Sequence, residues 1–299
     1  MSGDALDQDP AELRRRIDTS KAHPARVYDV FLGGKDNYPV DRAAAAAGLA
    51  ANPRGYLDVR HNRDFLRRAV TALVQEDGIR QWLDIGTGLP TAENVHQIAQ
   101  RIIPDSRVVY VDNDPVVLAH ARALLTSGSQ GRTDYIDADL KSPAQILEQA
   151  AKTLDFDQPI ALCLVAILHF IEDEEAYPIV RELVDALPAG SRLVLSHLTD
   201  DLNPENIRAV QRTYTERGFT FVLRSRADVE RFFTGNGLAL AEPGVVPVHH
   251  WRSEPAPVPE QPDPAYLASL DDIEKVRYYD INDVTDADIN VYGGVAAKP

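Results

Sequence analysis

The sequence has one cysteine in 299 residues, and this scarcity removes several classes of site. Cys163 has no partner for an internal disulfide and cannot build a thiolate metal cluster within one chain. It lies in the apolar run IALCLVAIL, where a small buried residue is expected rather than a nucleophile. No uncharged apolar run approaches the about 20 residues of a membrane span, and the polar start MSGDALDQDP lacks the apolar stretch of a signal peptide. We therefore expect a cytoplasmic protein without a membrane partner.

Basic residues are also fewer than acidic residues in this sequence. The chain has 31 Lys and Arg against 46 Asp and Glu, which gives a formal net charge of −15. Such a surface repels phosphate backbones, so nucleic acid is not an expected partner. Hydrophobic residues make up 44% of the chain, which is enough to bury a large core.

The apolar pattern predicts a helical N-terminal cap over residues 1–78 and a Rossmann-like domain over residues 79–299. Strands are expected at 80–85, 107–112, 133–136, 159–165 and 191–197. Helices are expected between and after them at 91–102, 115–126, 143–151, 174–187 and 203–217. This alternation is typical of βαβ units around a parallel sheet.

The C-terminal region predicts an antiparallel hairpin with a long insertion. The segments LALAEPGVVPVHHW and INVYGGVAAKP read as extended and could pair with each other. Between them, at about 253–288, lie the proline-rich SEPAPVPEQPDPA, an expected exposed linker, and an acidic stretch over 270–288. The helix before the hairpin is expected in SRADVERFFTGNG.

The stretch LDIGTGLPTAEN marks the turn from the first strand to the first helix, where open parallel sheets bind ligands. Gly86 and Gly88, on either side of Thr87, let the backbone approach a ligand and adopt positive φ. The dinucleotide fingerprint would need Gly or Ala at position 91, where this chain has Thr91, so a pyrophosphate is disfavoured. The sequence contains no G-x-x-x-x-G-K-[ST] loop either.

Three acidic residues follow three neighbouring strands. Asp84 suits a ligand with an ammonium group, Asp112 could accept hydrogen bonds from both ribose hydroxyls, and Asp139 could reach an adenine amino group. Together they describe a pocket for an adenosyl amino acid, which S-adenosylmethionine fits. The residues expected beside them at the strand ends are Asn113, Leu140 and Ala166.

Four strings of this sequence closely resemble the actinobacterial S-adenosylmethionine-dependent methyltransferase family long known as a domain of unknown function. They are DTSKAHPARVYDVFLGGKDNYPVDR, NRDFLRRAV, LDIGTGLPT and VVYVDNDPVVLAHARALL, and the resemblance covers residues 17–252 and the final VYGGVAAKP. It implies an α/β fold with a Rossmann-like class I methyltransferase sheet, mostly parallel with an antiparallel C-terminal hairpin, and a helical cap. It also implies binding of S-adenosylmethionine. Pro90 departs from the broader pattern, in which a third glycine is common.

Methyl transfer from a sulfonium needs few catalytic side chains, because the cofactor supplies the electrophile. His169, after the fourth strand, is a candidate general base, although a stacking or capping role is equally compatible. His197, at the end of the fifth strand, is a weaker candidate of the same kind. Tyr28 is a candidate for the acceptor site.

The segment YDVFLGGKDNY is interpreted as a lid that closes over the cofactor, with a helix-ending turn as the alternative. Arg63 is expected to pin this lid, and Tyr38 to line the acceptor site with Tyr28. The loop residues of this hypothesis are Gly33, Gly34, Lys35, Asp36 and Asn37.

No metal site is expected. His249 and His250 would point to opposite faces of a strand, and DINDVTDADIN lacks the glycine and final glutamate of a calcium loop, so solvated acid is favoured.

The leading hypothesis is an S-adenosylmethionine-dependent enzyme that methylates a small-molecule acceptor. A non-catalytic S-adenosylmethionine sensor is the alternative, since no unmistakable base is present. A nicotinamide-dependent oxidoreductase is weakened by Thr91 and by the lack of a suitably placed Tyr-x-x-x-Lys pair. Neither the accepting atom nor the oligomeric state follows from the sequence.

Overall fold

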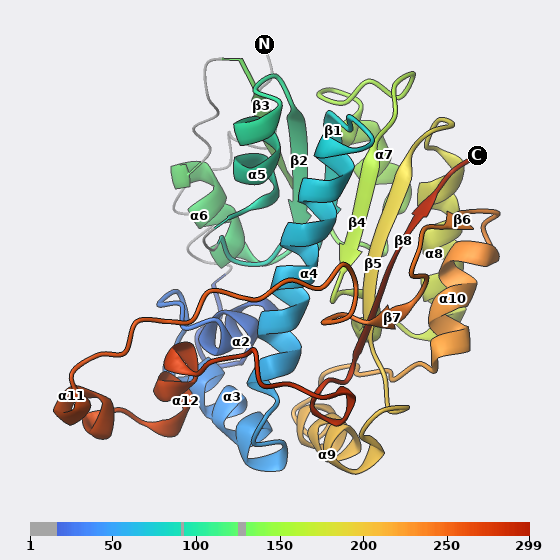
Figure 1. Cartoon of the computed structure of the whole chain (residues 1–299). Coiled ribbons are helices and arrows are strands. Elements are labelled where there is room, and N and C mark those ends of the chain that lie inside the picture. Colours follow the sequence, from blue (N-terminus) through green and yellow to red (C-terminus); the bar gives the residue numbers. More distant parts are fainter. Residues whose placement is uncertain (1–16, 91–92, 125–129) are drawn as a thin grey trace.

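A mixed β-sheet forms the centre of the computed structural model, which describes residues 17–90, 93–124 and 130–299 (Figure 1). The strand order is β3-β2-β1-β4-β5-β8-β6, and β7 also pairs with β8. The strands are β1 (Gln81–Ile85), β2 (Arg107–Asp112), β3 (Arg132–Asp137), β4 (Ala161–Val165), β5 (Arg192–Leu198), β6 (Ala239–Leu240), β7 (Val246–Pro247) and β8 (Val291–Ala297).

Strands β1 to β5 are parallel, whereas β8 runs antiparallel to β5, β6 and β7. The strands predicted from the sequence and the antiparallel C-terminal pairing are therefore confirmed. The chain builds outward from β1 through β2 to β3 and then returns to β4 on the other side of β1. This reversal leaves a crevice at the carboxyl ends of β1 and β4.

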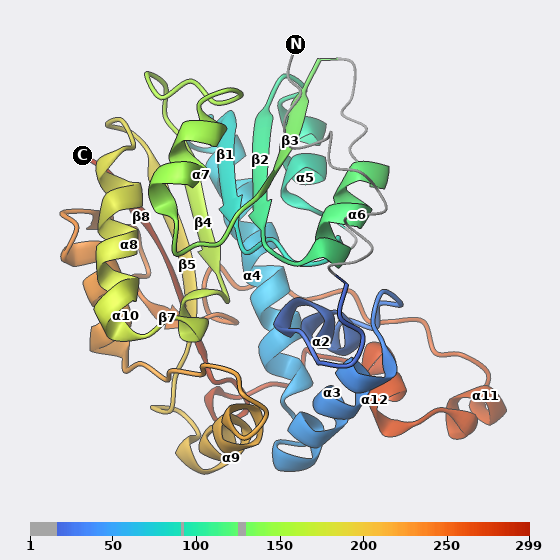
Figure 2. The ribbon, with the colours of Figure 1, turned by 180° about the vertical axis from the view of Figure 1, so that it is seen from behind.

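Helices cover both faces of the sheet (Figures 1 and 2). The connecting helices are α5 (Val95–Ile102), α6 (Pro115–Leu124), α7 (Pro143–Ala150), α8 (Asp173–Asp185), α9 (Pro204–Thr215) and α10 (Arg226–Thr234). Figure 2 shows α7 and α8 in front of the sheet, whereas α4 and α5 cover the face seen in Figure 1. Alternate residues of each strand enter one of two cores: Trp82 packs on the α4 and α5 side and Leu83 on the α7 and α8 side.

Helix α5 starts later than expected. The sequence pattern predicted a helix from residue 91, but the helix begins at Val95 because Asn94 and Gln97 form a capping box. Thr91 and residue 92 lie outside the described residues, as do residues 125–129 after α6. Asp114 caps α6 as its position before Pro115 suggests, since its carboxylate accepts a hydrogen bond from Val116 N (2.8 Å).

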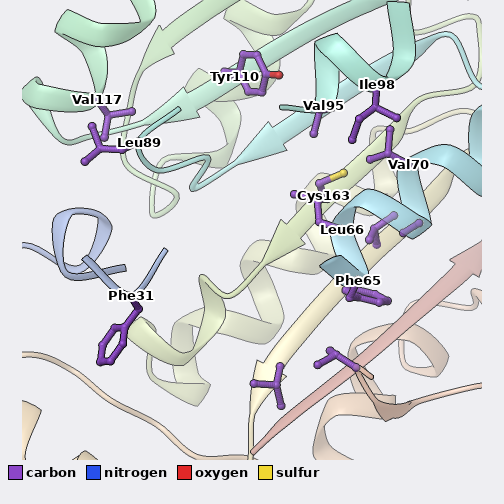
Figure 3. Close-up of a cluster of buried hydrophobic side chains, with 14 of the residues drawn as sticks. Phe31, Phe65, Leu66, Val70, Leu89, Val95, Ile98, Tyr110, Val117 and Cys163 are labelled. Carbon is purple, nitrogen blue, oxygen red and sulfur yellow. The ribbon is translucent and has the colours of Figure 1, made fainter. Parts of the chain in front are cut away.

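The N-terminal helices are α2 (Pro24–Phe31), α3 (Pro39–Ala51) and α4 (Tyr56–Gln75). Helix α4 shares the core of the sheet: Phe65, Leu66 and Val70 belong to the same buried cluster as Cys163 of β4 (Figure 3). The burial expected for Cys163 is therefore confirmed. Helices α2 and α3 lie beyond the carboxyl ends of the strands (Figures 1 and 2), and α3 packs against α9.

Residues 253–288, which we call the strap, cross the outer side of α4 (Figures 1 and 2). The proline-rich part is largely exposed, as predicted, and the rest contains α11 (Pro264–Ser269), α12 (Asp272–Lys275) and the 3₁₀ turns η2 (Val276–Tyr278) and η3 (Asp286–Asp288). Arg60 of α4 donates hydrogen bonds to the carbonyls of Val276 (3.1 Å) and Tyr279 (2.5 Å). The Arg60 side chain therefore fastens the strap to α4 through the carbonyls of the strap.

Among the described residues, no helix is both long enough and apolar enough to cross a bilayer.

Close packing between β8 and α4 yields a stability prediction. A β-carbon at Gly293 would lie 2.8 Å from Val248 Cγ1 and 3.0 Å from Phe65 Cζ. We expect Gly293→Ala to lower the free energy of unfolding by about 1–3 kcal/mol, because overpacking forces neighbours off their preferred positions. Urea denaturation measures this loss. Gly294→Ala is the matched control in the same strand, with closest approaches of 3.1 and 3.3 Å, and it should lose less. Equal losses in the two variants would contradict this account.

Candidate functional site

A cavity of about 380 Å³ lies at the crevice between the sheet and the cap helices. Its wall on the sheet side comes from the ends of β1, β2 and β4 and from the turn after β3. Its wall on the opposite side comes from α2, α4 and α9. The sheet-side residues are Asp84, Ile85, Gly86, Thr87, Gly88, Leu89, Val111, Asp112, Asn113, Ala138, Asp139, Leu140, Lys141, Val165, Ala166 and Ile167. All the residues predicted to bind the cofactor are among them.

The turn after β1 exposes peptide backbone to this cavity. Gly86 has φ of +75° and donates a hydrogen bond to Val111 O (2.8 Å), and a β-carbon there would lie 2.7 Å from the Ile167 side chain. Gly88 has φ of +66°, and a β-carbon at that position would project into open space. Glycine is therefore required at position 86 by conformation and by space, and Gly88 leaves the peptide surface uncovered.

Asp84 and Asp112 are buried carboxylates at the strand ends. Burial raises the pKa of Asp84 to about 6, while the Arg63 guanidinium and a hydrogen bond from Thr87 (3.2 Å) oppose this and the Asp112 charge adds to it. Burial also raises the pKa of Asp112, although its two oxygens accept hydrogen bonds from Gly88 N (2.8 Å) and Asp114 N (3.0 Å). Two acids with this environment favour a ligand that carries positive charge.

Asp139 lies at the exposed rim of the cavity. Its carboxylate accepts hydrogen bonds from Asn113 Nδ2 (3.2 Å) and Lys141 N (2.9 Å). Leu140 is buried beside it. The structure thus brings Asp84, Asp112 and Asp139 to one cavity, in the order expected from the strands that carry them.

A hydrogen-bonded chain links the cap to the end of β4. Tyr28 of α2 donates to Val59 O (3.1 Å) and accepts from Asn62 Nδ2 (3.0 Å). Ser196 of β5 donates to Asn62 Oδ1 (2.5 Å) and accepts from the N–H of Ala166, which has φ of +56° (3.0 Å). Burial raises the pKa of the Tyr28 phenol, so this group stays protonated at neutral pH and acts as a donor.

Asp58 is a cavity residue that the sequence reasoning missed. Burial raises its pKa to about 7, although Asn290 donates both its backbone N–H (2.5 Å) and its side-chain Nδ2 (3.2 Å) to the carboxylate. A signal was present in the sequence: Asp58 and Asn62 recur at helical spacing with Phe65 and Ala69, which places two polar residues on a buried stripe.

His169 is buried and lines the cavity, as its position after β4 suggested. Its ring packs against Phe170 and Phe221, with centroids 4.1 and 5.6 Å away, and within the described chain Nδ1 has no hydrogen-bond partner. Burial, with the nearby His197 and Arg224, holds its pKa well below the usual range, so the imidazole is neutral at physiological pH.

His197, expected to serve the substrate site, has a structural environment in this fold. This side chain is fully buried and is not among the residues that line the cavity. Its Nε2 lies 2.5 Å from Nη1 of Arg224, which also donates to the carbonyls of Leu168 and Ile171 (2.9 Å each). Burial, and then the Arg224 charge, lower its pKa to about 3. His197 therefore helps to anchor the loop that carries His169.

Of the segment 28–38, interpreted from the sequence as a lid, the first part lines the cavity through Tyr28, Asp29, Phe31 and Leu32, whereas residues 33–38 form a turn beside it. Gly33 and Gly34 end α2, and a β-carbon at Gly34 would collide with the Asp29 carboxylate. That carboxylate accepts hydrogen bonds from Asp36 N (3.1 Å) and Asn37 Nδ2 (2.9 Å), so the polar groups satisfy a turn. Lys35 is exposed, and Tyr38 packs under the Arg26 guanidinium (5.3 Å to the ring centroid). None of residues 33–38 lines the cavity.

Helix α2 covers the cavity in place of this loop. His23, Val27, Tyr28 and Phe31 line it. The start of α2 is held at the sheet edge by Asp114, whose Oδ2 lies 2.8 Å from His23 Nδ1. Arg63 does not hold residues 33–38 as expected: its guanidinium donates to Glu93 O (3.2 Å) and Asn94 Oδ1 (3.1 Å), next to the glycine turn.

Comparisons with known proteins agree with this geometry. A model of the S-adenosyl methyltransferase family matches residues 10–299. The chain is similar to the crystal structure of a DUF574 family protein from Streptomyces avermitilis, with 44% identity, a TM-score of 0.83, and coverage of 94% of this chain and 99% of that one. It is also similar to a candidate methyltransferase from Thermobifida fusca, with 35% identity, a TM-score of 0.77, and coverage of 98% and 99%.

Both of these organisms are actinobacteria. No curated protein matches the chain. The match over nearly the whole length and the two similar structures decide the family. The chain belongs to the S-adenosyl methyltransferase family, and it is an S-adenosylmethionine-dependent methyltransferase.

Proposed function

We propose that this methyltransferase acts on a small molecule with a largely apolar body, held between the cap and α9. The observation that carries the proposal is the composition of the cavity beyond the acidic strand ends. There the wall is apolar and aromatic and comes from Val27, Phe31, Val59, Leu198, Ile207, Val210, Tyr214 and Phe221. The whole cavity, with its cofactor side, has a volume of about 380 Å³, so the part lined by these residues suits a compact ligand better than a macromolecule.

The sheet side of the cavity suits the cofactor. S-adenosylmethionine supplies an electrophilic methyl group on a sulfonium. Asp84 would take the ammonium, Asp112 the ribose hydroxyls and Asp139 the adenine amino group, with the peptide surface at Gly86 and Gly88 beside them. Two buried carboxylates offset the positive charge of such a ligand, which supports this assignment.

The polar side chains on the acceptor side include Tyr28 and Asn62, which are joined by a hydrogen bond (3.0 Å), and Asp58 and His169. Tyr28 and Asn62 are placed to orient the accepting atom. Asp58 is better matched than His169 to take up a proton, since its pKa of about 7 lies near neutral pH, whereas the pKa of His169 is held far lower. We therefore assign positioning to Tyr28 and Asn62, proton uptake to Asp58 and ring packing to His169.

Two broader expectations remain predictions within this proposal. One is the domain division, with a cap over residues 1–78 and a Rossmann-like domain over residues 79–299. Residues 1–16 of the cap lie outside the described chain. The other is a cytoplasmic protein whose net charge of −15 disfavours nucleic acid as the acceptor.

Asp112→Ala tests the cofactor assignment. We expect about tenfold or greater weakening of S-adenosylmethionine binding by calorimetry, because a charge-assisted hydrogen bond to a ligand contributes about 1.5–3 kcal/mol. Asp137→Ala is the matched control: Asp137 is the register partner of Asp112 on β3 but does not line the cavity. Unchanged affinity in Asp112→Ala would place the ribose elsewhere, and binding of NAD in place of S-adenosylmethionine would refute the site.

The raised pKa of Asp84 predicts a pH dependence of cofactor binding. The ligand's positive charge favours the ionised carboxylate, and below pH of about 6 the protonated form dominates in the free protein. Affinity for S-adenosylmethionine should therefore fall as pH decreases from 7 to 5, by up to about tenfold per pH unit. Calorimetry across this range measures the slope. The slope should become shallower in Asp84→Asn, and an identical slope in that variant would remove Asp84 from the ammonium site.

The acceptor class is tested with S-adenosylmethionine labelled on its methyl group and a cell extract. We expect label in the small-molecule ultrafiltrate. Label confined to the macromolecular fraction would overturn the small-molecule proposal, and no label in any fraction under varied conditions would favour a sensor.

The same assay tests Asp58. Asp58→Asn should lower the transfer rate by about 100-fold, while calorimetric affinity for the cofactor changes less than about threefold. The wild-type rate should rise as pH increases through about 7, where Asp58 loses its proton, and the variant should lose this rise. A variant that keeps both the rate and the pH profile would show that Asp58 serves only to hold Asn290.

A further inference from the structure

His249, His250 and Asp286 form a cluster outside the residues that line the methyl-transfer cavity. His249 Nε2 and His250 Nε2 lie 3.1 and 2.6 Å from the same Asp286 oxygen, Oδ1. The candidate ligand atoms of the three residues all lie within 4.8 Å of one another. Two imidazoles and one carboxylate therefore meet at a single point.

The two histidines converge because the chain turns after β7. The sequence predicted a strand here, with adjacent side chains on opposite faces. In the structure β7 ends at Pro247, His250 N donates to Pro247 O (2.8 Å), and the two imidazole centroids are 3.9 Å apart. The argument that His249 and His250 point to opposite faces of a strand, and so cannot chelate one ion, is therefore wrong.

Hydrogen bonds from α4 hold this turn in place. Arg68 donates hydrogen bonds to Trp251 O (2.9 Å) and Val248 O (2.7 Å), one on each side of the histidine pair. His249 is buried, and its ring meets the edge of His61, with centroids 5.9 Å apart. The histidine ligands thus stand on a rigid support, as a preformed metal site requires.

Asp286 comes from the strap and is also held in place. It begins the 3₁₀ turn η3, whose start is capped by Thr285 and Asp288, and Asp288 pairs with Arg54 of the cap (2.8 Å). Asp286 and His250 are each more than half exposed, at 57% and 52% of their side chains, so an ion from solvent can reach them.

We propose that His249, His250 and Asp286 bind one divalent transition-metal ion, of which Zn²⁺ is the best fit. Imidazole and carboxylate ligands bind Zn²⁺ at about 2.0–2.2 Å and leave a fourth position for water in a tetrahedral site. Imidazole nitrogen selects against Ca²⁺ and Mg²⁺, which prefer oxygen ligands. The ion fastens the strap to the turn that rests on α4, the helix that carries Asp58 and Asn62 into the cavity.

The test is calorimetric titration of chelator-treated full-length protein with Zn²⁺. We expect one Zn²⁺ per chain, at least about tenfold weaker binding in His250→Ala and in Asp286→Asn, and no binding of Ca²⁺ or Mg²⁺ at the same concentration. His120→Ala is the control: His120 is a partly exposed histidine that pairs with Asp36 (3.4 Å), and this variant should bind Zn²⁺ like the wild type.

A second readout is the midpoint of thermal unfolding, which Zn²⁺ should raise in the wild type and leave unchanged in His250→Ala. The unfolding curve of each variant in the presence of chelator shows whether that variant is folded. Asp286→Asn is a second ligand variant, since Asp286 is an exposed residue on a different segment from His250. Wild-type protein without stoichiometric Zn²⁺ uptake would overturn the proposal. An affinity unchanged in both ligand variants, or reduced equally in His120→Ala, would overturn it as well.

Discussion

Two buried carboxylates at the ends of neighbouring parallel strands set the electrostatics on which the site depends. Asp84 and Asp112 face one cavity, and burial raises the pKa of both. The surrounding contacts reduce the cost of this arrangement: Gly88 donates its N–H to Asp112, and Arg63 lies near Asp84. A ligand with positive charge would offset the two carboxylates, in agreement with the proposed assignment of a sulfonium cofactor to this site.

Helix α4 connects the parts of the molecule. Its buried stripe places Asp58 and Asn62 at the cavity and, further along the helix, packs Phe65 into the core of the sheet. Arg60 of the same helix holds the strap. Because α4 packs in the core, it joins the N-terminal helices to the sheet. Helix α2 contacts the end of β2 through His23 and Asp114.

The sheet and the acidic strand ends could be predicted because their signals are local. Apolar runs mark the strands, and Gly86 and Gly88 mark the turn. Two of the differences involve partners distant in sequence: Arg224 makes His197 structural, and Asn290 contributes to the environment of Asp58. The third is local but depends on side-chain direction, because the Asp29 carboxylate accepts the hydrogen bonds of the polar loop. The convergence of His249 and His250 depends on where β7 ends, which apolar alternation alone does not fix.

The position of α2 also bears on the order of events during turnover. Helix α2 lies across the cavity, and Asp139 and Lys141 lie on its exposed rim. In the proposed assignment, the adenosyl end of the cofactor lies at this rim and the acceptor lies deeper inside. The acceptor must then enter before the cofactor closes the entrance, or enter past the edge of α2, and the spent cofactor has to depart before a deeply held product can follow. Such geometry favours a compulsory sequence of binding and release over a random one.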